Sequence, residues 1–132
     1  ASMDKDQLLS IFNKQFKEFV EDISRVFPMN SDISAFKTII GQVLNITPKT
    51  IFKTFKKYVV DKYRAEIEAG DIEFFINKDY NSDLANSGNN TILEKIDCLR
   101  GPVKEMNPAE QAKVIKYLQN MAKLCQLHEE AA

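Results

Sequence analysis

A stripe of apolar residues at helical spacing runs through residues 4–27, and it constrains the fold more than any other feature of the sequence. The members of the stripe recur every three or four positions: Leu8, Phe12, Phe16, Phe19, Ile23 and Phe27. This period places all of them on one face of an α-helix of more than about five turns. Pro28 follows directly and ends the helix, because proline cannot continue one.

The helical period returns twice in the next forty residues or so. Residues 31–45 form the second expected helix. Thr47 and Pro48 then give a helix-start signal, with Thr47 as the N-cap and Pro48 at the first helical position. We expect the third helix to run from this signal to about Ala69, where Gly70 provides a C-terminal stop.

Cap signals also divide the remainder of the chain. Asp71 is expected to cap a short fourth helix, and Thr91 a fifth one, which the Gly101–Pro102 pair interrupts. Asn107 begins the last helix, with Pro108 at the first helical position and Glu110 completing a capping box. No alternating strand pattern competes with these helices.

These segments predict a compact all-α fold, a single-domain bundle of five main helices plus one short helix. The 132 residues suit one domain. We expect the helical domain to span residues 4–128, with a polar loop at 78–90 and a frayed tail at 129–132. Residues 1–3 are interpreted as a cloning scar followed by the natural start at Met3.

Composition excludes several classes of protein. Apolar residues make up 44% of the chain and charged residues 28%, with a net charge of −1, which argues against a disordered tail and against a uniformly basic nucleic-acid coat. No stretch approaches the ~20 apolar residues that span a bilayer, and no secretory signal is recognisable. We therefore expect an intracellular protein that is not secreted and does not enter a membrane.

Charge is distributed unevenly along the chain. Residues 1–66 carry a net charge of +3, and residues 67–132 carry −4. A molecule with this asymmetry can associate head to tail with its own copies, or present one basic face to a partner.

The cysteines and the single histidine do not predict a reactive centre. Cys98 and Cys125 have no Cys-x-x-Cys partner, and with His128 they are too few for a four-ligand zinc site. Both are interpreted as reduced, half-buried residues, although a disulfide between them is possible if the helices bring them together. His128 lies in the fraying segment, so it is not expected to activate Cys125.

One half-motif in the polar loop resembles the start of a calcium site. Asp79, Asn81 and Asp83 have the right spacing, but the sixth and twelfth positions, Leu84 and Asn90, lack the required Gly and Glu. Turns stabilised by short polar side chains explain these residues better. No metal and no cofactor is predicted.

A basic arc on the third helix is the first candidate binding surface. Its members span roughly one third of the helix circumference: Lys49, Lys53, Lys56, Lys57 and Arg64. Five cations on one exposed face can follow a phosphate backbone or meet an acidic protein. The alternative interpretation is a solvated helix face that is partly paired with Asp or Glu from elsewhere.

Adjacent aromatic residues form the second candidate surface. Phe74 and Phe75 cannot both be buried on the same face of a helix, so one of them is expected to be exposed, beside Tyr80 and the 78–90 loop. Exposed aromatic side chains favour protein contacts. The alternative is that the second Phe forms another wedge of the core.

Several motifs together resemble small helical proteins encoded by nucleocytoplasmic large DNA (giant) viruses. The most recognisable segment is Phe74–Tyr80. It is accompanied by these motifs: Phe27-Pro28, Phe36-Lys37-Thr38, Tyr58-Val59, Ile96-Asp97, Lys116-Tyr117-Leu118 and Leu124-Cys125. The resemblance implies a setting rather than a mechanism, namely the host cytoplasm, a viral factory or the virion.

The leading functional hypothesis is a non-enzymatic helical module that binds a viral or host protein through Phe74, Phe75 and Tyr80. The alternative is a nucleic-acid-binding accessory protein that uses the basic arc. An enzyme with a composite site between copies of the chain is the third hypothesis, and no acid–base constellation in the sequence favours it.

Overall fold

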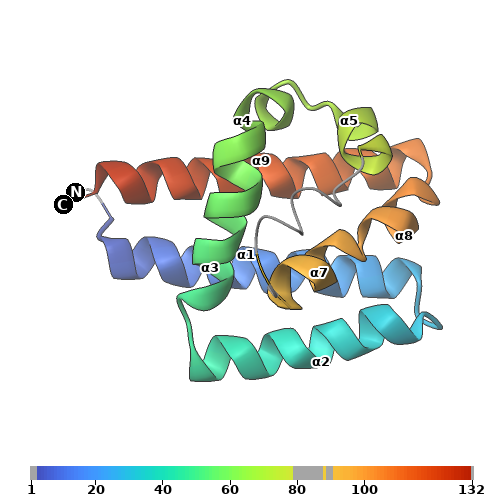
Figure 1. Ribbon diagram of the computed structural model, residues 1–132, viewed down its shortest axis with the longest axis horizontal. Helices are drawn as coiled ribbons and strands as arrows, with labels where there is room; N and C mark the ends of the chain where they lie inside the picture. The colour runs from blue at the N-terminus through green and yellow to red at the C-terminus, as the bar shows by residue number, and fades with distance from the viewer. Residues whose placement is uncertain (1–2, 79–87, 89–90, 132) are drawn as a thin grey trace.

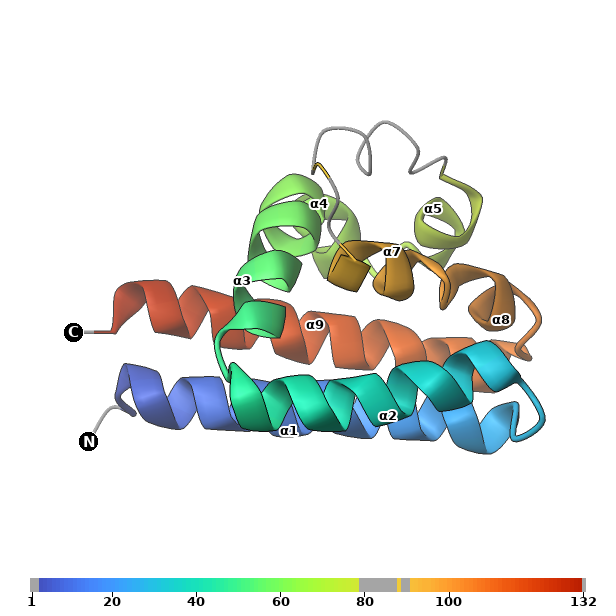
Figure 2. The same cartoon turned by 60° about the horizontal axis from the view of Figure 1, so that its bottom comes forward.

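The computed structural model describes residues 3–78, 88 and 91–131, and it confirms a compact all-α bundle. Figures 1 and 2 show two layers of helices. One layer contains the three long helices α1 (Lys5–Val26), α2 (Ser31–Ile46) and α9 (Pro108–Glu130). The shorter helices lie across it, and both ends of the chain emerge at the same end of the molecule (Figure 1).

Helix α1 confirms the expected apolar stripe. Its buried residues are Leu8, Leu9, Phe12, Phe16, Phe19, Val20 and Ile23. Asp4 caps the helix by accepting a hydrogen bond from the Gln7 amide at 2.8 Å, and the Gln7 side-chain oxygen accepts one from the Asp4 amide at 2.9 Å. The chain turns back after Phe27, so α2 runs antiparallel to α1.

The C-terminal helix α9 lies beside α1 and is longer than expected (Figure 1). Its capping box between Asn107 and Glu110 is formed as predicted. The helix continues to Glu130, two residues into the 129–132 segment that is predicted to fray. Glu129 there lies 2.6 Å from the Lys56 ammonium, and this ion pair holds the last turn.

The third segment departs most from the prediction. It begins at Thr50 rather than at Thr47, whose hydroxyl donates backward to the Val43 carbonyl at 3.4 Å. It is also three pieces instead of one helix: α3 (Thr50–Phe55), the π-helical turn η1 (Lys56–Val60) and α4 (Asp61–Glu68). Tyr63 departs further from helical geometry, with φ −124° and ψ 28°.

Short helices complete the second layer. Gly70 takes φ +69° at the end of α4, as expected of a glycine stop, and Asp71 caps α5 (Ile72–Asn77) through the Phe74 amide. Helix α7 (Thr91–Asp97) ends before the Gly101–Pro102 pair, which belongs instead to α8 (Arg100–Lys104). Pro102 is tolerated in the first turn of α8, where its missing amide proton has no intrahelical partner to lose.

The core lies between the two layers and is rich in phenylalanine. The ring of Phe16 is fully buried and packs against rings from α1, α2 and α3: Phe12, Phe19, Phe36 and Phe55. Within the described residues, no helix combines the length and apolar character needed to cross a bilayer.

Candidate functional site

Three aromatic rings meet at the surface where α4 and α5 lie close together. The Tyr63 ring is 5.4 Å from Phe74 and 6.2 Å from Phe75, and the two Phe rings stand perpendicular at 5.3 Å. All three side chains are half-buried. The Lys78 ammonium lies 5.4 Å from the centre of the Tyr63 ring, a cation–π distance. We call Tyr63, Phe74 and Phe75 the aromatic cluster.

The aromatic cluster differs from the sequence-based expectation in how far Phe74 and Phe75 are exposed. Neither Phe74 nor Phe75 is fully exposed, because each packs on Tyr63 and on the other. Phe75 also faces an internal cavity, so it serves as the wedge that the alternative interpretation describes. Tyr80 and most of the expected 78–90 loop lie outside the described residues.

The predicted basic arc is partly neutralised by ion pairs. The Lys56 ammonium lies 2.9 Å from Asp61 and 2.6 Å from Glu129, and hydrogen bonds to Glu129 and then Asp61 raise its pKa. Arg64 lies 3.4 Å from the same Asp61 carboxylate. Two of the five expected cations are therefore engaged within the protein.

The π-helical turn also alters how the remaining cations are arranged. Lys49 precedes α3 and Lys53 lies on it, whereas Lys57 lies within η1 and Arg64 beyond it. The 100° per residue of an α-helix does not hold across η1, so the angular spacing on which the predicted arc was based does not apply to the whole segment. Lys57 instead lies over the Tyr58 ring at 5.1 Å.

His128, near the C-terminal end of α9, lies among several charged side chains. The His128 ring packs on Phe52 at 4.6 Å. Burial lowers the pKa of His128, and the positive charges of Lys5, Lys56 and Lys49 lower it further. Each of these lysines therefore lies near His128, together with Asp6, whose charge raises the pKa. A helix-by-helix analysis of the sequence does not predict this neighbourhood, because Lys5 is distant from the other two in sequence.

The positions of the two cysteines do not indicate a reactive site. Both cysteines are free; Cys98 is exposed and Cys125 is buried, so neither is half-buried as expected. Burial raises the pKa of the Cys125 thiol to about 12, which keeps it protonated and unreactive. Within the described residues, no group of three or more His, Cys, Asp or Glu side chains could hold a metal ion.

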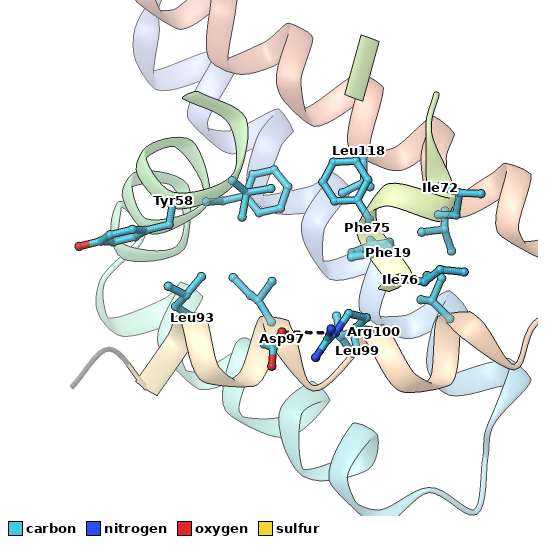
Figure 3. A pocket seen from close by; sticks show the side chains of 15 residues that line it. Phe19, Tyr58, Ile72, Phe75, Ile76, Leu93, Asp97, Leu99, Arg100 and Leu118 are labelled. Carbon is cyan, nitrogen blue, oxygen red and sulfur yellow. Dashed lines mark ion pairs between the residues drawn. The ribbon is translucent and has the colours of Figure 1, made fainter. Parts of the chain in front are cut away.

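An apolar cavity of about 100 Å³ lies under the second layer of helices, and the sequence gives no sign of it (Figure 3). Its lining comes from α1, α3, η1, α5, α7, α8 and α9. Apolar side chains dominate it, and Asp97 and Arg100 are its charged members, with 3.6 Å between the carboxylate and the Arg100 Nε. Such convergence of distant segments has no local sequence signature.

Comparison with known proteins identifies no relative of the chain. No protein-family model matches the chain, and no significant match is found to a curated protein or to a solved structure.

Proposed function

We propose that the protein is a non-enzymatic interaction module that binds a protein partner through the aromatic cluster. The observation that carries the proposal is the meeting of three half-exposed aromatic rings from two helices at one place on the surface. Aromatic side chains supply large contact areas with few rotatable bonds, and they dominate the energetics of protein interfaces.

The surroundings of the aromatic cluster indicate the chemistry of the partner. Lys78 lies against the Tyr63 ring, so the rim of the surface is cationic while its centre is apolar. Apolar centres with charged rims are typical of protein interfaces. The partner is proposed to offer apolar side chains flanked by carboxylates. The resemblance to giant-virus proteins supports a viral or host protein as that partner, in the host cytoplasm, a viral factory or the virion.

Replacing Phe74 with alanine is expected to weaken binding of the partner at least about thirtyfold, since truncating an interface hot spot removes roughly 2 kcal/mol or more. The partner is first captured from infected cells with the wild-type chain, and its affinity for each purified variant is then measured by titration. Phe27→Ala is the matched control, because Phe27 is another half-buried Phe and lies at the end of α1. Equal binding by wild type, Phe74→Ala and Phe27→Ala would contradict the proposal.

The exposed lysines of the third segment favour nucleic-acid binding as a second candidate function. Lys49, Lys53 and Lys57 are exposed, and no ion pair within the described residues engages them. Lys5 adds a fourth cation in the neighbourhood of His128, where Lys49 also acts.

Under this second function, affinity for labelled DNA or RNA is expected to fall about 10²-fold between 50 and 200 mM salt, because roughly four phosphate contacts release counterions. Fluorescence anisotropy over a salt series measures this slope. The double variant Lys53→Glu/Lys57→Glu should lose binding, whereas Lys113→Glu/Lys116→Glu, exposed on α9, should keep most of it. Absence of saturable binding at the lowest salt would remove the nucleic-acid function.

A further inference from the structure

The apolar cavity has the shape of a small ligand site. Eight of its lining residues are buried, among them Phe19, Phe55, Leu99, Val103, Val114 and Leu118. Tyr58, Phe75 and Ile96 also line it and are only half-buried, and Figure 3 shows Tyr58 at the edge of the lining. A closed packing defect would be enclosed by buried residues throughout, whereas this cavity reaches partly exposed ones.

The π-helical turn η1 contributes one side of the cavity. Tyr58 and Val59 belong to η1, and both line the cavity. Single π-helical turns are rare, and they occur frequently at functional sites. Here the turn directs an aromatic and a branched side chain at the same space, which a continuous α-helix from α3 to α4 would place differently.

A buried polar atom at the cavity lacks a hydrogen bond. Asp97 Oδ1 is buried and accepts no hydrogen bond from any described group. The nearest donor in its ion pair, Arg100 Nε, is 3.6 Å away, beyond hydrogen-bond distance. The Arg100 guanidinium is turned instead toward the Lys78 carbonyl, to which its Nη1 donates. Buried acceptors without a partner are destabilising, so a ligand that donates a hydrogen bond to this atom removes that cost.

From these observations we propose that the cavity binds a small apolar alcohol. Its apolar body lies between the Phe and Leu side chains, and its hydroxyl donates a hydrogen bond to Asp97 Oδ1. Arg100 already balances the charge of the carboxylate, which favours a neutral donor over an ammonium group. The volume is below the ~150 Å³ that accommodates benzene in an apolar protein cavity, so an aromatic alcohol bound at Asp97 extends its ring past the half-buried lining residues.

The test is a titration of the full chain with benzyl alcohol and with toluene, its counterpart without the hydroxyl, followed by amide chemical shifts in NMR spectra. Shift changes are expected at cavity residues, with benzyl alcohol binding about tenfold more tightly because a hydrogen bond to a charged acceptor distinguishes the two probes. The absence of shifts up to the solubility of both probes would overturn the proposal, and so would equal affinities.

Three variants separate the cavity from other binding modes. Ile96→Phe places a larger side chain in the cavity and should abolish binding of both probes. Ile46→Phe is the matched control, since Ile46 is 78% exposed on α2, and it should bind both probes as the wild type does. Asp97→Leu should keep toluene binding while benzyl alcohol loses its advantage. Shifts that persist in Ile96→Phe would place the probes elsewhere and reject the site.

The ligand site does not depend on the proposed protein partner. Phe75 is the residue that the cavity and the aromatic cluster share, whereas Phe74 belongs to the cluster alone. Phe74→Ala should therefore bind benzyl alcohol within about twofold of wild type, even where it loses the protein partner. The two proposals can consequently fail separately.

Discussion

Phe16→Ala is expected to lower the free energy of unfolding by about 3–5 kcal/mol, the usual range for truncating a buried Phe. Phe16 is fully buried, and four other rings surround it. Those rings come from α1, α2 and α3, so they belong to both layers of the bundle and cannot all close over the space left by the missing side chain. The loss is therefore expected near the upper part of the range rather than at its lower end.

Urea denaturation followed by circular dichroism measures this effect. Phe74→Ala is the control, because it deletes the same side chain from a half-buried position and should cost markedly less stability. A domain of this kind has about 5–15 kcal/mol of total stability, so Phe16→Ala removes a large share of it. If the two variants unfold at the same urea concentration, Phe16 is not at the centre of the core.

The features that the sequence predicts correctly depend on local signals that no distant contact overrides. The stripe from Leu8 to Ile23 has one period that only a helix satisfies, and all its members are buried. The capping box at Asn107 and the glycine stop at Gly70 involve neighbouring residues alone, so the chain encodes them without tertiary help.

The errors fall where tertiary contacts decide the outcome. Glu129 pairs with Lys56, which lies 73 residues earlier in another element, and no local pattern predicts that pair. The π-helical turn at Lys56–Val60 lies in a stretch without Gly or Pro, where propensity alone favours a continuous α-helix. Tertiary packing commonly overrides such weak local preferences, and here it interrupts the helix on which the predicted basic arc was based.

The candidate sites can be predicted only in part from the sequence. Phe74 and Phe75 were identified because adjacent aromatic residues cannot share one helix face. Their stacking on Tyr63 cannot be predicted from the sequence, since it depends on how α4 and α5 meet. The cavity requires seven elements to converge, so neither Asp97 nor Arg100 stands out before the chain is folded.

The thiol-labelling rates of the two cysteines are expected to differ by a factor of about 10³ or more. Burial raises the pKa of Cys125 from 9.0 to about 12, and each unit lowers the thiolate fraction tenfold at neutral pH. Cys98 is exposed and reacts at an ordinary rate. A chromogenic disulfide reagent should therefore modify one thiol per folded chain in a fast phase and the second in a slow phase. Cys98→Ser should remove the fast phase alone.

The same burial links Cys125 to the stability of the fold. The unfolded chain releases this proton near pH 9, whereas the folded chain holds it until about pH 12. The unfolded state therefore binds fewer protons between these values, and stability falls as the pH rises above 9.

Labelling of Cys125 must then proceed through opening of the core, because the folded state presents neither the thiolate nor a path to it. Global unfolding becomes more frequent in proportion to the lost free energy of unfolding, so Phe16→Ala should accelerate the slow phase by roughly 10³-fold or more. Phe74→Ala should accelerate it far less. A slow phase that is equally fast in wild type and Phe16→Ala would show that Cys125 is reached by a local fluctuation of α9, independent of the phenylalanine core.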